Sequence, residues 1–177
     1  MLRQTPCDRF AREPLSRSRR AFGTGAIVSV LLVIGNPAQA AGGIPLRLAG
    51  TIDESPTPDA VCGGMRNETH GVLTGTLGQT RWSSAECIDA TAEPGGFVIR
   101  DGRFVLRTSQ GSLTGTLGGY ASGPNARGHL SFSGRFSITK GSQRYEGATG
   151  SGLAVADVNL SANTAELDLA GTLRYPR

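Results

Sequence analysis

The side chains best suited to chemistry in this chain gather between residues 68 and 86. They are Glu68, His70, Arg81, Trp82 and Glu86. A carboxylate near an arginine and an aromatic ring can bind the polar end of a small ligand or act as a general acid. We therefore take Glu68 and Glu86 as candidate catalytic groups. His70, Arg81 and Trp82 are candidate ligand contacts. The alternative is an ordinary cross-strand ion pair with Trp82 in the core.

The sequence shows few other patterns of catalytic or metal-binding residues. Serine and threonine are plentiful, but no G-x-S-x-G segment presents a nucleophile. His70 and His129 are the only histidines, and each stands alone. We therefore expect no metal site and no cofactor, and we expect both histidines at the surface or at strand ends.

Cys62 and Cys87 are the only cysteines after residue 40, because Cys7 lies in the N-terminal segment. A bridge between them would close a loop of about 25 residues and stabilise the fold by about 3 kcal/mol. Two cysteines can also bind a metal, but no second pair of ligands stands near them at zinc spacing. We expect a structural disulfide.

Residues 1–40 have the order of a secretory leader. Six arginines precede an apolar run at residues 25–34, and the segment ends in Ala38-Gln39-Ala40. Ten apolar residues of about 1.5 Å rise cannot span a hydrocarbon core of about 30 Å, which argues against a membrane anchor. We expect cleavage near Ala40 and a periplasmic or secreted protein. Residues 18–22 (Ser-Arg-Arg-Ala-Phe) resemble a twin-arginine export signal, and the Sec route is the alternative.

The net charge of +4 belongs to this leader. Without its six arginines and two acids, residues 41–177 carry 12 basic and 12 acidic side chains. A neutral domain lacks the excess of positive charge that attracts nucleic acid or anionic membranes. We therefore expect neither as a partner.

Alternation of apolar and polar residues predicts β-strands through residues 41–177, which form one domain. Residues 46–52, 130–138 and 165–175 show it most clearly. In this pattern Arg135, Glu166 and Asp168 face away from the apolar side. We expect them on a solvated exterior.

Short connections divide this region into about eight strands, which suits a sandwich or a barrel. Residues 71–78 return almost unchanged as residues 111–118, but the echo is complete only twice, which favours a closed sheet over a solenoid or propeller. Asp101-Gly102 predicts a tight hairpin turn, because such turns need positive φ. Residues 123–128 and 160–164 predict further turns.

A glycine interrupts the apolar face of every strong strand, and such glycines mark bends or close approaches. One interpretation is packing, in which a Phe or Trp from across the core fills each gap. The other is a slot for a small apolar ligand. We favour packing. The glycines are Gly50, Gly75, Gly115, Gly134 and Gly171.

Residues 134–152 carry the most distinctive motif, G-R-F-S-I-T-K-G-S-Q-R-Y-E-G-A-T-G-S-G. It resembles the G-x-F-x-I-T-G-G-T-G-R-F/Y-x-G-A-T/R-G stretch of bacterial exported proteins with an allene oxide cyclase-like, or dirigent-like, barrel. The resemblance implies an all-β fold, an antiparallel β-barrel of about eight strands. Lys140, Ser142 and Gln143 depart from the motif, so we expect a plain structural hairpin rather than an anion-binding loop.

The sequence is compatible with three functions. The first, which we favour, is a non-catalytic exported barrel that binds a small apolar ligand or has a structural role. The second is an isomerase or cyclase of the allene oxide cyclase or dirigent type, although none of its plant members' catalytic residues has a counterpart here. The third is a self-assembling module, which would be a homo-oligomer. A void with a buried carboxylate would favour the enzyme, and a filled core the others.

Overall fold

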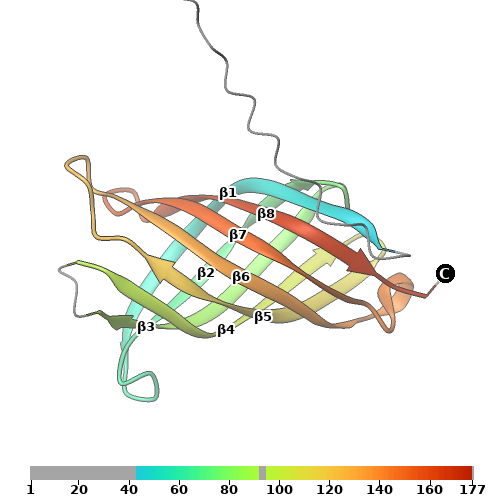
Figure 1. The fold of residues 1–177 in the computed structure, drawn as a ribbon, viewed down its shortest axis with the longest axis horizontal. Helices are drawn as coiled ribbons and strands as arrows, with labels where there is room; N and C mark the ends of the chain where they lie inside the picture. The colour runs from blue at the N-terminus through green and yellow to red at the C-terminus, as the bar shows by residue number, and fades with distance from the viewer. Residues whose placement is uncertain (1–42, 92–94, 177) are drawn as a thin grey trace, which may run out of the picture. The chain divides into compact units, whose positions relative to one another are not determined.

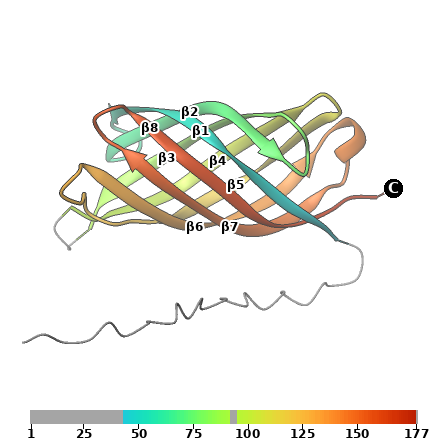
Figure 2. The same ribbon diagram turned by 90° about the horizontal axis from the view of Figure 1, so that it is seen from above.

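A computed structural model describes residues 43–91 and 95–176. The described residues form eight strands, each antiparallel to the next, and β8 pairs with β1 to close a barrel (Figure 1). The strands tilt across the barrel wall (Figure 2). The predicted all-β barrel is confirmed, and its closure excludes a solenoid. The strands are β1 (Ile44–Asp59), β2 (Gly64–Gly75), β3 (Thr80–Ala90), β4 (Phe97–Thr108), β5 (Gly111–Ala121), β6 (His129–Gly141), β7 (Thr149–Asn159) and β8 (Thr164–Arg174).

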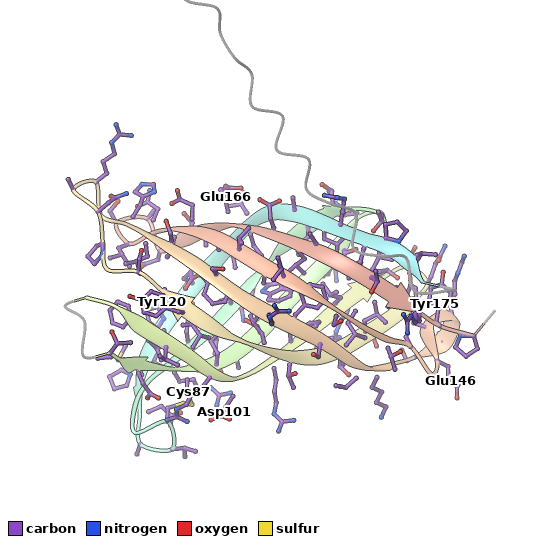
Figure 3. All side chains as sticks on the ribbon, viewed as in Figure 1. Cys87, Asp101, Tyr120, Glu146, Glu166 and Tyr175 are labelled. Atoms are coloured by element: carbon purple, nitrogen blue, oxygen red, sulfur yellow. A yellow bond between two sulfur atoms is a disulfide. The ribbon has the colours of Figure 1, made fainter. Side chains whose placement is uncertain are left out.

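Side chains alternate between the interior and the solvent along the strands, because successive residues of a strand point to opposite faces. In β8, Leu167 and Leu169 are buried, while Glu166 and Asp168 are exposed. Arg135 is exposed in β6. Glu166 points away from the barrel wall in Figure 3. The predicted exterior position of Arg135, Glu166 and Asp168 is confirmed.

One end of the barrel is filled. We call it the packed end, and it carries the 3-10 helix η1 (Gln143–Tyr145), near Glu146 and Tyr175 in Figure 3. Tyr145 is buried and meets Tyr175 edge to face, with ring centroids 5.5 Å apart. Deeper inside, Phe104 stacks on Trp82 at 5.3 Å and meets Phe136 edge to face at 6.2 Å. Aromatic pairs of this kind stabilise a core beyond the area that they bury.

The inward-facing glycines are covered by close neighbours rather than by rings from across the core. A methyl group at Gly115 would lie 2.6 Å from Phe104 Cζ of the adjacent strand. A methyl group at Gly134 would lie 2.5 Å from Phe132 Cζ of the same strand. All five glycines, including Gly50, Gly75 and Gly171, also face backbone atoms of neighbouring strands, in accordance with their expected role as close-approach positions.

The hairpin predicted at Asp101-Gly102 is wrong. Both residues lie within β4, where the register shifts against β3 and β5 and leaves one extra residue on β4. Asp101 has φ of 54°, so the pair satisfies the positive-φ requirement as a β-bulge instead of a turn. The other two predicted turns are present between β5 and β6 and between β7 and β8. The segment with the distinctive motif forms the β6–η1–β7 connection, a structural hairpin as expected.

The predicted disulfide between Cys62 and Cys87 is present. Cys62 lies in the β1–β2 connection and Cys87 lies near the end of β3. Arg100 of β4 donates to the carbonyl oxygen of Cys62 at 2.6 Å and forms an ion pair with Asp89. These contacts hold the β1–β2 connection against the end of the barrel that is opposite η1.

Candidate functional site

A cavity of about 280 Å³ occupies the end of the barrel opposite η1, which we call the cavity end. Pro56, Pro124 and Leu160 are exposed at its rim, and Cys87 and Tyr120 lie toward this end in Figure 3. The volume is at the lower limit of typical small-molecule pockets. The rest of the lining is mainly apolar: Ile52, Met65, Trp82, Ile88, Phe97, Ile99, Leu117, Ala121, Leu130, Phe132, Ala156, Val158 and Leu167.

Two carboxylates share one amide at the wall of this cavity. Asn67 of β2 donates from Nδ2 to Glu54 Oε2 of β1 at 2.6 Å and to Glu86 Oε1 of β3 at 3.0 Å. The amide oxygen of Asn67 accepts from the backbone N–H of Ser55 at 3.2 Å. Asn67 and Glu86 are direct cross-strand partners, so the pairing register places them side by side.

The polar row continues deeper into the barrel through residues of β2 and β3. Ser84 donates to Glu86 Oε2 at 2.7 Å, and the hydroxyls of Ser84 and Thr69 lie 2.8 Å apart. The indole N–H of Trp82 donates to Thr69 Oγ1 at 2.6 Å. Thr69 and Ser84 are also cross-strand partners. We call Glu54, Asn67, Thr69, Trp82, Ser84 and Glu86 the polar row.

Burial makes Glu86 an unusually weak acid. It is 7% exposed, and loss of hydration, with a smaller contribution from the nearby Glu54 carboxylate, raises its pKa from 4.5 to about 7. Hydrogen bonds from Ser84 and Asn67 act in the opposite direction but do not compensate. Burial also raises the pKa of Glu54, against the hydrogen bond from Asn67. Near neutral pH, the protonated and the ionised forms of Glu86 are therefore both populated.

No cation neutralises this pair among the residues that the structure describes. Arg66 lies on the opposite side of β2, where it forms an ion pair with Glu68 at 3.1 Å. Its effect on the pKa of Glu86 is the smallest of the contributions. The cavity wall thus presents buried acidic groups in an apolar space without a basic partner. Within the described part of the chain, no three His, Cys, Asp or Glu side chains gather as metal ligands.

The barrel wall divides the five residues singled out from the sequence. Glu86 and Trp82 point inward and line the cavity. Glu68, His70 and Arg81 are exposed on the outer face. His70 and Arg81 border a shallow groove there together with Asp53 and Arg107. Their roles as ligand contacts remain predictions, but they do not share a site with Glu86.

Four members of the polar row were missed from the sequence: Glu54, Asn67, Thr69 and Ser84. The alternation of inward and outward residues along each strand could have identified them. Glu54 is two residues from the buried Ile52, and Ser84 lies midway between Trp82 and Glu86, so each shares the inward face. Asn67 and Thr69 have the same parity within β2 as the buried Leu73. His129, by contrast, lies at the start of β6 with Nδ1 2.6 Å from Asp157 Oδ1.

The fold and the site define a small closed antiparallel β-barrel with a ligand-sized cavity at one end. Comparison of the chain with protein-family models, curated proteins and solved structures finds no significant match. Among the described residues, no helix is long and apolar enough to cross a membrane.

Proposed function

We propose that this protein binds a small, mainly apolar molecule in the cavity end of its barrel. The observation that carries the proposal is the contrast between the two halves of one interior. Phe104, Phe136 and Tyr145 fill the packed end, whereas the cavity end leaves about 280 Å³ between apolar side chains. Lining atoms of an empty space lose packing contacts, which an apolar ligand restores.

A purely structural barrel does not account for the buried acids. Burying a carboxylate is costly, and replacing such groups with packed apolar residues is often neutral or stabilising. The raised pKa values of Glu54 and Glu86 reflect that cost. Their presence in the cavity wall supports recognition of a ligand's polar group.

An isomerase or cyclase of the allene oxide cyclase or dirigent type is the second candidate. Glu86 favours it, because a buried carboxyl with a pKa of about 7 is suited to general acid–base catalysis near neutral pH. The motif at residues 134–152 supports the same family, and with it self-assembly as a further prediction. Binding is the step common to both candidates. Turnover requires Glu86 to move a proton, so a Glu86→Gln variant would bind substrate without converting it.

Trp82 offers a direct test of binding, because it is the only tryptophan of the chain and lines the cavity. We expect 1-octanol to change its fluorescence saturably. Ala156→Phe, which places a ring inside the cavity, should weaken this binding at least about tenfold, since an overfilled site excludes the ligand. Ala170→Phe on the exposed face of β8 is the matched control and should leave it unchanged. Equal binding by both variants, or no saturable change in the native protein, would refute the proposal.

Export to an oxidising compartment completes the proposed function. The leader pattern at residues 1–40, which lies outside the described residues, supports export, and the Cys62–Cys87 disulfide is compatible with it. We expect the intact mass of protein recovered from the periplasm to correspond to a chain that begins at Ala41. Recovery of the uncleaved chain in the cytoplasm alone would contradict this prediction.

A further inference from the structure

We propose that the ligand of the cavity is a lipophilic amine, whose protonated head lies between Glu54 and Glu86 while its tail occupies the apolar lining. This inference rests on the proposed binding function and adds the chemical class of the ligand. It follows from the hydrogen-bond donors and acceptors of the polar row and from the charge of the cavity wall.

Every donor hydrogen of the polar row is already used when both carboxyls are ionised. Asn67 donates its two amide hydrogens to Glu54 and Glu86, and Ser84 donates its hydroxyl hydrogen to Glu86. Because the hydrogen of Ser84 is committed, the 2.8 Å contact with Thr69 is donated by Thr69. The indole N–H of Trp82 is committed to Thr69 Oγ1. The row therefore has no donor left for a ligand.

Acceptors remain free at the same place. Glu54 Oε1 has no hydrogen bond from any described residue, and each carboxylate oxygen can accept more than one. A ligand group that donates hydrogen bonds complements this wall, whereas a group that only accepts does not. An ammonium group has three donors and no acceptor, which is the complement of two adjacent carboxylates.

The negative charge of the cavity wall also favours an amine as the ligand. From the other strands, the cavity lining contributes only uncharged side chains, including Ile99 of β4, Leu117 of β5, Phe132 of β6, Ala156 of β7 and Leu167 of β8. Arg66, the cation that contributes to the pKa of Glu86, lies on the outer face. A cation inside the cavity would supply the missing counter-charge, and hydrogen bonds between charged groups are about twice as strong as neutral ones.

Three ligands with one tail and different heads test the proposal: octylamine, 1-octanol and octanoic acid, all below their micellar concentrations. At pH 8, where Glu86 is ionised and the amine is protonated, we expect octylamine to bind at least about tenfold more tightly than 1-octanol, and octanoate to bind most weakly. Trp82 fluorescence measures each affinity. Lowering the pH from 8 to 5 protonates Glu86 and should weaken octylamine binding but not 1-octanol binding.

Matched variants assign the effect to the two acids. Glu86→Gln and Glu54→Gln should each weaken octylamine binding about tenfold and change 1-octanol binding by less than about threefold. Glu166→Gln, which removes a carboxylate from the exposed face of β8, should change neither. If 1-octanol or octanoic acid binds the native protein as tightly as octylamine at pH 8, the amine assignment is overturned while the binding function stands. If none of the three binds, both proposals fail.

Discussion

Replacing Glu86 with glutamine raises the free energy of unfolding by about 3 kcal/mol at pH 8 and changes it little at pH 4. The folded state raises the pKa of Glu86 from 4.5 to about 7, and each unit corresponds to about 1.4 kcal/mol. A raised carboxyl pKa means that the folded protein holds the proton more tightly than the unfolded chain. The stability that this gives is complete below about pH 4.5 and is lost as the pH rises to about 7. Glutamine stays neutral throughout and avoids that loss.

Urea unfolding at pH 4, 6 and 8 measures the effect. Glutamine retains an oxygen that accepts from Asn67 and gains an N–H that donates to Ser84, so the packing of the site is conserved. Glu166→Gln is the matched control and should show no such gain in stability, since Glu166 lies on the exposed face of β8. A Glu86→Gln variant less stable than the native protein at pH 8 would show that the carboxylate is not buried in an apolar site.

Replacing both Cys62 and Cys87 with alanine lowers the free energy of unfolding by about 3 kcal/mol. The two cysteines are 25 residues apart, and a cross-link over such a loop removes chain entropy mainly from the unfolded state. The loss also frees the β1–β2 connection beside the cavity. Glu86, next to Cys87 in β3, is then less firmly placed.

Urea unfolding of the oxidised native protein and of the double variant at one pH measures the difference. Dithiothreitol provides the internal control, because it should destabilise the native protein by a similar amount and leave the double variant unchanged. A difference below about 1 kcal/mol would mean that the bridge does not hold the cavity end.

The fold could be predicted to a large extent because each strand by itself shows the alternation of apolar and polar residues. The leucines of β8 and the exposed Glu166 and Asp168 between them need no knowledge of neighbouring strands. The hairpin predicted at Asp101-Gly102 was wrong because a residue with positive φ can form a β-bulge as well as a turn. Only the pairing on both sides of β4 shows that the strand continues through these residues.

The site was harder to predict, because it depends on the register between strands. Glu86 and Trp82 were recognised, and their spacing of four places them on one face of β3. That Asn67 joins Glu86 to Glu54 depends on the registers of β1, β2 and β3. The registers of β4, β5 and β6 bring Phe104 and Phe136 together outside the cavity lining, so one half of the interior is filled and the other half is left hollow.

A carbon-13 NMR titration of the glutamate carboxyls, with and without octylamine, shows whether the cavity holds a buried acid that pairs with an amine. We expect one carboxyl, absent from the Glu86→Gln variant, to titrate near pH 7 in the free protein and at least about one unit lower with saturating octylamine, because the cation favours the ionised form. A Glu86 midpoint near 4.5 in both samples would mean that Glu86 is neither buried in an apolar site nor paired with the amine.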